Sequence, residues 1–213
     1  MKTHSSKSII LGHKNFGELD KLIFLYNEEL GKIKVIAKGA RKITSKFTGH
    51  LESLSIAETS LYFGPKNIIL TEIDPIKSYK NIRTDYQKLS CALQIAEISN
   101  QLIYENQKIE HLMELFEEAL HQIDTSNKPQ LTAIYYIIKL LDQTGFIPNF
   151  KENQSSIKKK YLKFLHYTQT QSLETITKIS LSNEEENDIK NILTRIIEYQ
   201  TNFAPKSLII SMI

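Results

Sequence analysis

The stretch that decides the N-terminal fold is KIKVIAKGARKITSK, residues 32–46 of the chain. Successive side chains of an extended strand point to opposite faces, so Ile33, Val35 and Ala37 share one apolar face that can pack a core. The other face is expected to carry Ile36 and three lysines that point into solvent: Lys32, Lys34 and Lys38. The following loop adds further cations.

Similar short segments, rich in Ile, Val, Thr and aromatic residues and separated by glycines, extend from residue 8 to about residue 79. This pattern is typical of a small barrel or sandwich. Five strands in this length favour an OB-type barrel, and an SH3-like barrel fits almost as well on strand count alone. The expected strands are residues 8–13, 19–26, 32–38, 51–62 and 67–78.

Beyond about residue 81 the hydrophobic period becomes helical. Apolar residues recur every three or four positions from Ile109 to Ile123, which predicts an amphipathic helix. Residues 131–141 are too densely apolar for a surface helix and predict a central one, which Gly145 is placed to end.

A last helix is expected to begin at Ser182, because Glu185 lies three residues on, as in a capping box. Residues 149–156 are the least regular stretch and are expected to connect two helices. The predicted fold class is therefore α+β, with a five-stranded OB-type β-barrel domain in residues 1–80 followed by an all-α helical domain in residues 81–213.

The composition excludes several classes of protein. The chain has 213 residues, of which 41% are hydrophobic and 24% charged, as in ordinary globular proteins. Its one cysteine, Cys91, cannot form an internal disulfide or a multi-thiolate metal site. No apolar run approaches the roughly 18 residues that cross a membrane, and no signal peptide follows Met1. We expect a cytoplasmic protein without a membrane segment.

No catalytic site is expected. The sequence contains no nucleophile elbow, P-loop, dinucleotide fingerprint or zinc-hydrolase helix. Its six histidines are scattered, and none stands at ligand spacing from a second His or Cys. The run Glu184–Glu186 fits the first turn of a helix better than acid chemistry. The sequence therefore predicts a protein that is not an enzyme and has neither a cofactor nor a metal.

The positive charge is concentrated in the N-terminal part. Residues 1–80 carry 13 Lys and Arg against 8 Asp and Glu, whereas residues 81–213 carry 14 against 16. Between Leu30 and Leu51 there is no acid at all, although a surface that only aids solubility normally mixes both signs. Cations on an OB barrel favour binding of nucleic-acid phosphates. The candidate DNA-binding residues are Lys32, Lys34, Lys38, Arg41, Lys42 and Lys46.

Aromatic residues near these cations could stack on bases. Phe47, Tyr62 and Phe63 are the candidates, although each is more commonly a core residue. A second basic patch, at Lys158–Lys160 and Lys163, is expected chiefly to be the outer face of an amphipathic helix.

Three spaced elements stand out in this N-terminal part: GELDKL at residues 17–22, LGK at residues 30–32, and AKGARK at residues 37–42 with Ser45 downstream. Together they resemble the N-terminal pattern of RecO-type recombination mediators. The later LLDQTGFIP, residues 140–148, is similar to the helix end that precedes a variable insert in that family.

The resemblance implies a DNA-repair protein without catalytic turnover that acts on the bacterial nucleoid. Such proteins bind single- and double-stranded DNA, anneal strands coated by single-strand-binding protein, whose C-terminal tail is a partner, and act with RecR to load RecA. The DNA-binding role carries over to Lys38, Arg41 and Lys42, whereas Lys32, Lys34 and Lys46 rest on the charge pattern. Glu18 and Asp20 also match, and we expect them to be structural.

The sequence departs from the family in one place. Many members carry four cysteines after the helix end, which form a zinc site, whereas this chain has none there, so zinc is not expected. Two alternative functions fit the basic barrel: an interaction scaffold whose basic face binds an acidic protein tail, and an RNA-binding OB protein.

Overall fold

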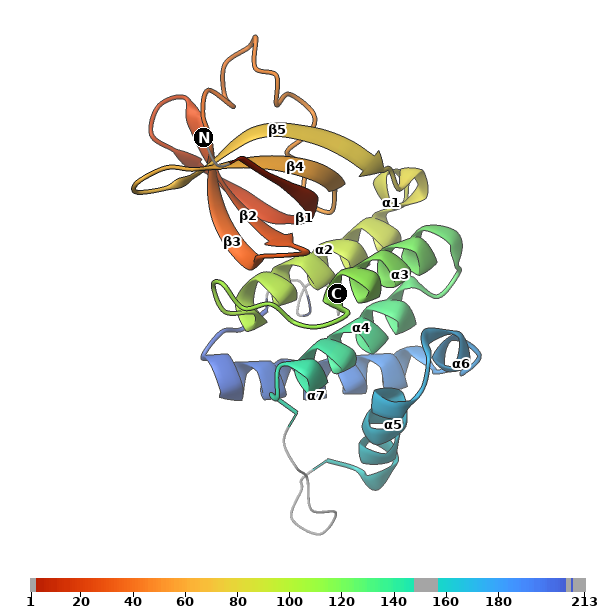
Figure 1. The fold of residues 1–213 in the computed structure, drawn as a ribbon. Coiled ribbons are helices and arrows are strands. Elements are labelled where there is room, and N and C mark those ends of the chain that lie inside the picture. Colours follow the sequence, from red (N-terminus) through yellow and green to blue (C-terminus); the bar gives the residue numbers. More distant parts are fainter. Residues whose placement is uncertain (1–2, 148–156, 206–207, 209–213) are drawn as a thin grey trace. The chain divides into compact units, whose positions relative to one another are not determined.

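The computed structural model describes residues 3–147, 157–205 and 208 (Figure 1). These residues form two compact units. The first comprises Met1–Ser78 and Ile103–Met113, and the second comprises Tyr79–Leu102 and Glu114–Ile213. The predicted connection at residues 149–156 lies outside the described residues. The predicted division at residue 80 stays a prediction about independent domains, since the first unit also draws on residues 103–113.

The first unit is a closed five-stranded barrel, as the sequence predicts. Its strands are β1 (Thr3–Phe16), β2 (Asp20–Asn27), β3 (Gly31–Ala37), β4 (Ile56–Phe63) and β5 (Ile68–Lys77). They close in the order β1-β2-β3-β5-β4, in which only the β3–β5 pairing is parallel. This Greek-key order identifies the barrel as OB-type, which decides the choice that strand count left open.

Strand β1 is much longer than the predicted residues 8–13, because it pairs with two strands. Its first half, from Thr3 to Ile9, pairs with β4, and its second half pairs with β2. The register shifts between Ile10 and Gly12, and a bulge of this kind bends the strand so that the barrel can close.

The barrel core contains the predicted apolar face of β3. Ile33, Val35 and Ala37 are all at most 2% exposed and belong to one cluster with residues of every other strand. Phe47 and Leu51 join this cluster from the segment that connects β3 to β4. The prediction that a strand begins at residue 51 is therefore wrong at its start, since β4 begins only at Ile56 and the earlier apolar residues fill the core from a loop.

Residues 103–113, which are irregular as far as residue 111, hydrogen-bond to the start of β3. The N–H group of Lys32 donates to the Gln107 carbonyl at 3.1 Å, and the N–H group of Asn106 donates to the Lys32 carbonyl at 2.7 Å. The hydroxyl of Tyr26 also donates to the carbonyl of Ile109 at 2.8 Å. The barrel is therefore completed by a segment that lies some 25 residues beyond β5 in the sequence.

The second unit is all-helical. Its helices are α1 (Lys80–Thr84), α2 (Tyr86–Leu102), α3 (Leu112–Thr125), α4 (Pro129–Gln143), α5 (Lys159–Thr170), α6 (Leu173–Thr177) and α7 (Asn183–Thr201). Helix α4 packs against α2, α5, α6 and α7, which confirms the central helix predicted from its dense apolar residues. None of the described helices is both long and apolar enough to span a membrane.

The predicted helix ends are also observed. Gly145 follows α4 with φ +74°, a left-handed conformation that glycine adopts without strain. At α7 the Ser182 hydroxyl accepts from the Glu185 N–H group, and the Glu185 carboxylate accepts from the Ser182 N–H group. The capping box predicted from residue spacing is therefore confirmed.

Candidate nucleic-acid interface

The basic loop, residues 38–46, leaves β3 through consecutive turns. Gly39 has φ +66°, and its carbonyl accepts from the Lys42 N–H group at 3.1 Å. The Lys42 carbonyl in turn accepts from the Ser45 N–H group at 3.0 Å. Compact turns of this kind direct side chains outward, and Lys38, Arg41, Lys42 and Lys46 are all exposed.

The basic loop is fastened to the β1–β2 turn. The Asp20 carboxylate accepts from the Gly39 N–H group at 2.7 Å, and the Leu19 carbonyl accepts from the Arg41 N–H group at 2.9 Å. The Arg41 guanidinium donates to the carbonyls of Gly17, at 3.3 Å, and Glu18, at 2.8 Å. Two of the sequence elements, GELDKL and AKGARK, thus meet in space, and Asp20 is structural, as expected.

Three cations of the basic loop lack a carboxylate partner in the part of the chain that the structure describes. Among the described residues, none forms an ion pair with Lys38, Lys42 or Lys46. The Lys46 ammonium lies 5.6 Å from the centre of the Phe47 ring, a cation–π distance. Their charge is therefore open to a polyanion in solution.

Lys32 lies elsewhere than the strand pattern predicts. Its side chain does not face solvent: the residue is 8% exposed, and its ammonium donates to the Ile103 carbonyl at 2.8 Å. Burial, and to a lesser extent the charge of the neighbouring Lys34, lowers the pKa of Lys32 to about 8. Alternation along β3 could not reveal this, because residues 103–113 cover that part of the strand. The structure does not bring Lys32 together with the basic loop at the surface.

Lys34 faces solvent as predicted, but it is paired. Its ammonium donates to the Glu105 carboxylate at 2.5 Å, and both side chains are about half exposed, at 44% and 49%. A phosphate would have to share this cation with Glu105. The acid-free stretch in the sequence is therefore not acid-free in space at this position.

The aromatic candidates for base stacking differ in exposure. Phe47 belongs to the barrel core and is 4% exposed, so it cannot stack on a base. Phe63 is 42% exposed and its ring meets that of His4 edge-on. Sequence reasoning missed Phe16, at the end of β1, which is 46% exposed. In the sequence, its position directly before the turn glycine Gly17 indicates a strand end, where a side chain can be exposed.

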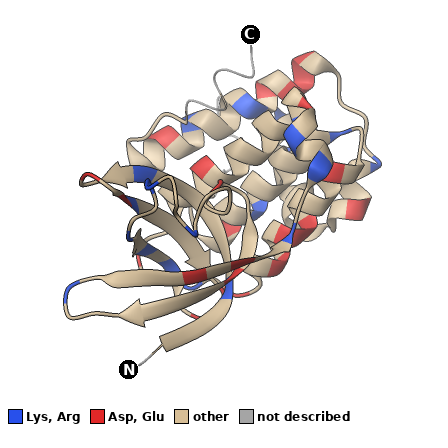
Figure 2. Ribbon diagram, turned by 90° about the horizontal axis from the view of Figure 1, so that it is seen from above, with Lys and Arg blue, Asp and Glu red and all other residues tan. Residues whose placement is uncertain are grey.

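Charge elsewhere is mixed. Lys and Arg are interspersed with Asp and Glu over the helices of the second unit (Figure 2). In the second basic patch, Lys160 is paired with Glu185 at 3.1 Å, and its neighbours lie on the exposed face of α5. This agrees with the expectation of a solvated helix face.

In the described parts of the chain, no three His, Cys, Asp or Glu side chains are grouped so that they could hold an ion. Cys91 is buried in α2, and burial raises the pKa of its thiol to about 12, which keeps it protonated and unreactive.

The barrel topology and the basic loop define an OB-fold protein with a helical unit, a class in which many barrels bind oligonucleotides. Two family models match this chain. The model described as "Recombination protein O N terminal" matches residues 1–79, and "Recombination protein O C terminal" matches residues 83–156. The chain belongs to the RecO family.

Several relatives named DNA repair protein RecO are similar to this chain. One from Dehalococcoides mccartyi is 32% identical over 76% of this chain and 64% of its own length. One from Thermoanaerobacter sp. is 29% identical over 77% of this chain and 66% of its own length. One from Caldanaerobacter subterraneus is 23% identical over 92% of both chains. The first two matches thus cover slightly less than two thirds of each relative.

Proposed function

We propose that this protein is a non-catalytic DNA-binding mediator of DNA repair and recombination. The observation that carries the proposal is the basic loop on an OB barrel, where Lys38, Lys42 and Lys46 are exposed and carry no carboxylate partner among the described residues. Family membership supports the role in repair, since the similar relatives are named DNA repair proteins.

In this role the protein binds single- and double-stranded DNA and anneals complementary strands. It acts with RecR and with the C-terminal tail of single-strand-binding protein, and thereby helps RecA to load. The basic loop binds phosphates, which carry no sequence information, so binding is expected to tolerate any sequence. We assign the phosphate contacts to Lys38, Lys42 and Lys46, whereas Arg41 chiefly holds the loop against the β1–β2 turn.

The test is DNA binding by the parent and K38A/K42A, measured by fluorescence anisotropy across a sodium chloride series. Each phosphate contact on a single strand contributes about −0.7 to the slope of log K against log salt, so the double variant should flatten the slope by about 1.4. Arg41 is left unchanged, because its substitution would also disturb the loop.

The matched control is K158A/K163A, which removes the same charge from exposed positions at α5. It should bind DNA with the parent's slope. If the two double variants weaken binding equally, only net charge matters and the basic loop is not the site. Parallel titrations with RNA of the same sequence and with an acidic peptide separate the DNA mediator from the two alternative functions.

Annealing is tested with complementary strands that have been coated by single-strand-binding protein. The parent should accelerate annealing and K38A/K42A should not. A protein that binds naked DNA but leaves the coated strands unannealed would contradict the mediator role.

A further inference from the structure

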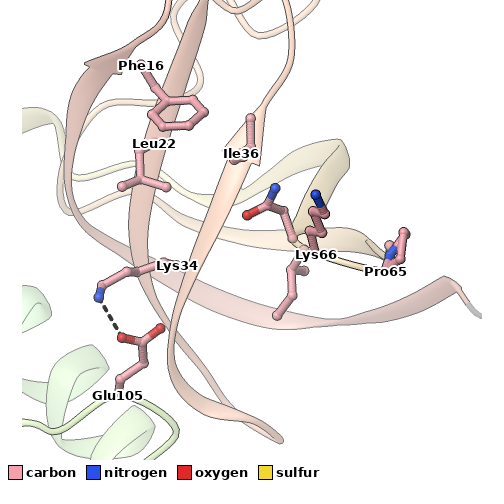
Figure 3. Close-up of a pocket in the computed structure, with 10 residues that line it drawn as sticks. Phe16, Leu22, Lys34, Ile36, Pro65, Lys66 and Glu105 are labelled. Carbon is pink, nitrogen blue, oxygen red and sulfur yellow. Dashed lines mark hydrogen bonds and ion pairs between the residues drawn. The ribbon is translucent and has the colours of Figure 1, made fainter.

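A pocket of about 480 Å³ lies on the outer surface of the barrel (Figure 3). Its walls come from the end of β1, from β2 and β3, from residues 64–68 at the β4–β5 turn, and from Glu105. This volume falls within the range of about 300–1,000 Å³ that is usual for ligand sites. All these residues belong to the first unit.

One end of the pocket is apolar and aromatic. Leu22 and Ile36 are cross-strand partners on β2 and β3 and line this end, and the half-exposed ring of Phe16 lies beside them (Figure 3). A flat aromatic face at the surface of an OB barrel is suited to stacking against another flat ring.

The remaining walls combine the charged side chains of Lys34, Lys66 and Glu105 with the apolar Pro65 and Ile68. Lys34 and Glu105 form their ion pair at the other end, and Lys66 comes from the β4–β5 turn (Figure 3). Asn67 also lines the pocket, and its amide can both donate and accept hydrogen bonds. The Gly64 N–H group donates to the Asn67 carbonyl at 3.1 Å, which closes the turn that carries both residues.

We propose that this pocket holds one unpaired base of single-stranded DNA, stacked on Phe16. An unpaired base has two apolar faces, a polar edge and a flanking phosphate on each side. The pocket offers the matching surfaces: Phe16 for the ring face, Asn67 and the Lys34–Glu105 pair for the edge, and Lys66 for a phosphate. A base inside a duplex is already stacked and paired, so it cannot enter.

The pocket adjoins the basic loop. Phe16 directly precedes Gly17, whose carbonyl accepts from Arg41, and Phe16 pairs across the turn with Asp20, whose carboxylate holds Gly39. A strand bound through its phosphates at Lys38 and Lys42 therefore reaches the pocket with a neighbouring nucleotide. The inference rests on the proposed DNA binding and adds that the protein distinguishes single strands from duplex.

The test compares F16A with F63A, since both remove a half-exposed phenyl ring from the barrel but only Phe16 lines the pocket. Binding is measured with a labelled single strand longer than about 16 nucleotides, the upper end of the site sizes of OB folds, and with its blunt duplex. One stacked base corresponds to about a tenfold loss of single-strand affinity in F16A. Duplex affinity should stay within about twofold of the parent, and F63A should match the parent on both DNAs.

The outcomes separate this inference from the phosphate site. If F16A binds the single strand like the parent, or loses single strand and duplex equally, the base pocket is wrong, whatever K38A/K42A does. If F16A loses single-strand affinity while K38A/K42A binds both DNAs normally, the phosphate site fails and the pocket stands. Thermal unfolding verifies that F16A is folded, and F16L, which keeps an apolar side chain, should lose single-strand affinity as well.

A direct readout is available because the chain has no tryptophan. In F16W the emission of the only indole should be quenched by a single strand and not by the same strand with abasic sites, which keeps the phosphates and lacks the bases. F63W should respond to neither. Equal quenching of F16W by the abasic strand would show that no base stacks at this position.

Discussion

At the scale of the residue, Lys32 is a buried cation whose proton is held less tightly in the folded protein than in the unfolded chain. Its pKa is about 8 when folded, against 10.5 ordinarily, because burial disfavours the charged form. Between these two values the unfolded chain holds more protons, so the contribution of Lys32 to stability rises with pH across this interval. Below pH 8 the cost of burying the charge is fully present.

Replacing Lys32 by methionine should remove this cost. The free energy of unfolding of K32M, measured by urea denaturation, should exceed that of the parent by the largest amount below pH 8. This difference should shrink as the pH rises to about 10. A difference that stays constant between pH 7 and pH 10 would contradict a buried, protonated Lys32.

Asp20 is the second residue with a defined structural role. Replacing it by alanine leaves the Gly39 N–H group without its carboxylate partner and should lower the free energy of unfolding by about 1 to 2 kcal/mol. Asn at this position keeps an acceptor oxygen and should lose less. E18A removes the same charge from the same turn and serves as the control; an equal loss in E18A would show that charge rather than the hydrogen bond matters.

At the scale of the element, the contact between β3 and residues 103–113 depends on Gly31. A Cβ atom at this position would lie 2.3 Å from the Gln107 carbonyl oxygen, and the residue has φ +73°. Gly17 has φ +58° and open space around it. Substitution of Gly17 therefore reports backbone strain alone, whereas substitution of Gly31 reports strain and displacement of the segment.

We expect G17A to lower the free energy of unfolding by about 1–2 kcal/mol, the cost of a left-handed alanine. G31A should cost clearly more, and it should speed hydrogen exchange at the Lys32 and Asn106 amides, which bond across this contact. Equal stability of G17A and G31A, with unchanged exchange, would mean that residues 103–113 do not depend on a close approach at Gly31.

At the scale of the whole molecule, hydrophobic period predicted a five-stranded barrel and the central helix α4, because each buries a regular face, and capping-box spacing predicted the start of α7. The strand order then identifies the barrel as OB-type. Hydrophobic period could not predict that residues 103–113 complete the barrel, since that contact is made by backbone groups and by the missing side chain of Gly31. The prediction that Lys32 faces solvent is wrong for the same reason, because its ammonium donates to the carbonyl of Ile103 in this segment. The predicted start of β4 is wrong because Phe47 and Leu51 are apolar loop residues that pack in the barrel core.

The candidate site was predictable to a similar extent. The basic loop follows from the acid-free stretch, and three of its lysines are exposed without carboxylate partners among the described residues. The pairing of Lys34 with Glu105 joins residues 71 positions apart, and the pocket beside Phe16 is lined by residues from five separate segments, Phe16 included. Such groupings depend on tertiary structure, so no local sequence pattern predicts them.

The return of residues 103–113 to the barrel has a consequence for protein synthesis. All five strands have been translated once the ribosome has passed Lys77. The carbonyls that accept from the side chains of Lys32 and Tyr26 belong to Ile103 and Ile109, which are translated only after α2. At roughly 5–20 residues per second, this interval lasts about 2–7 seconds. During this interval the start of β3 lacks the segment that covers it. The first unit can therefore complete its folding only after translation of the second unit has begun.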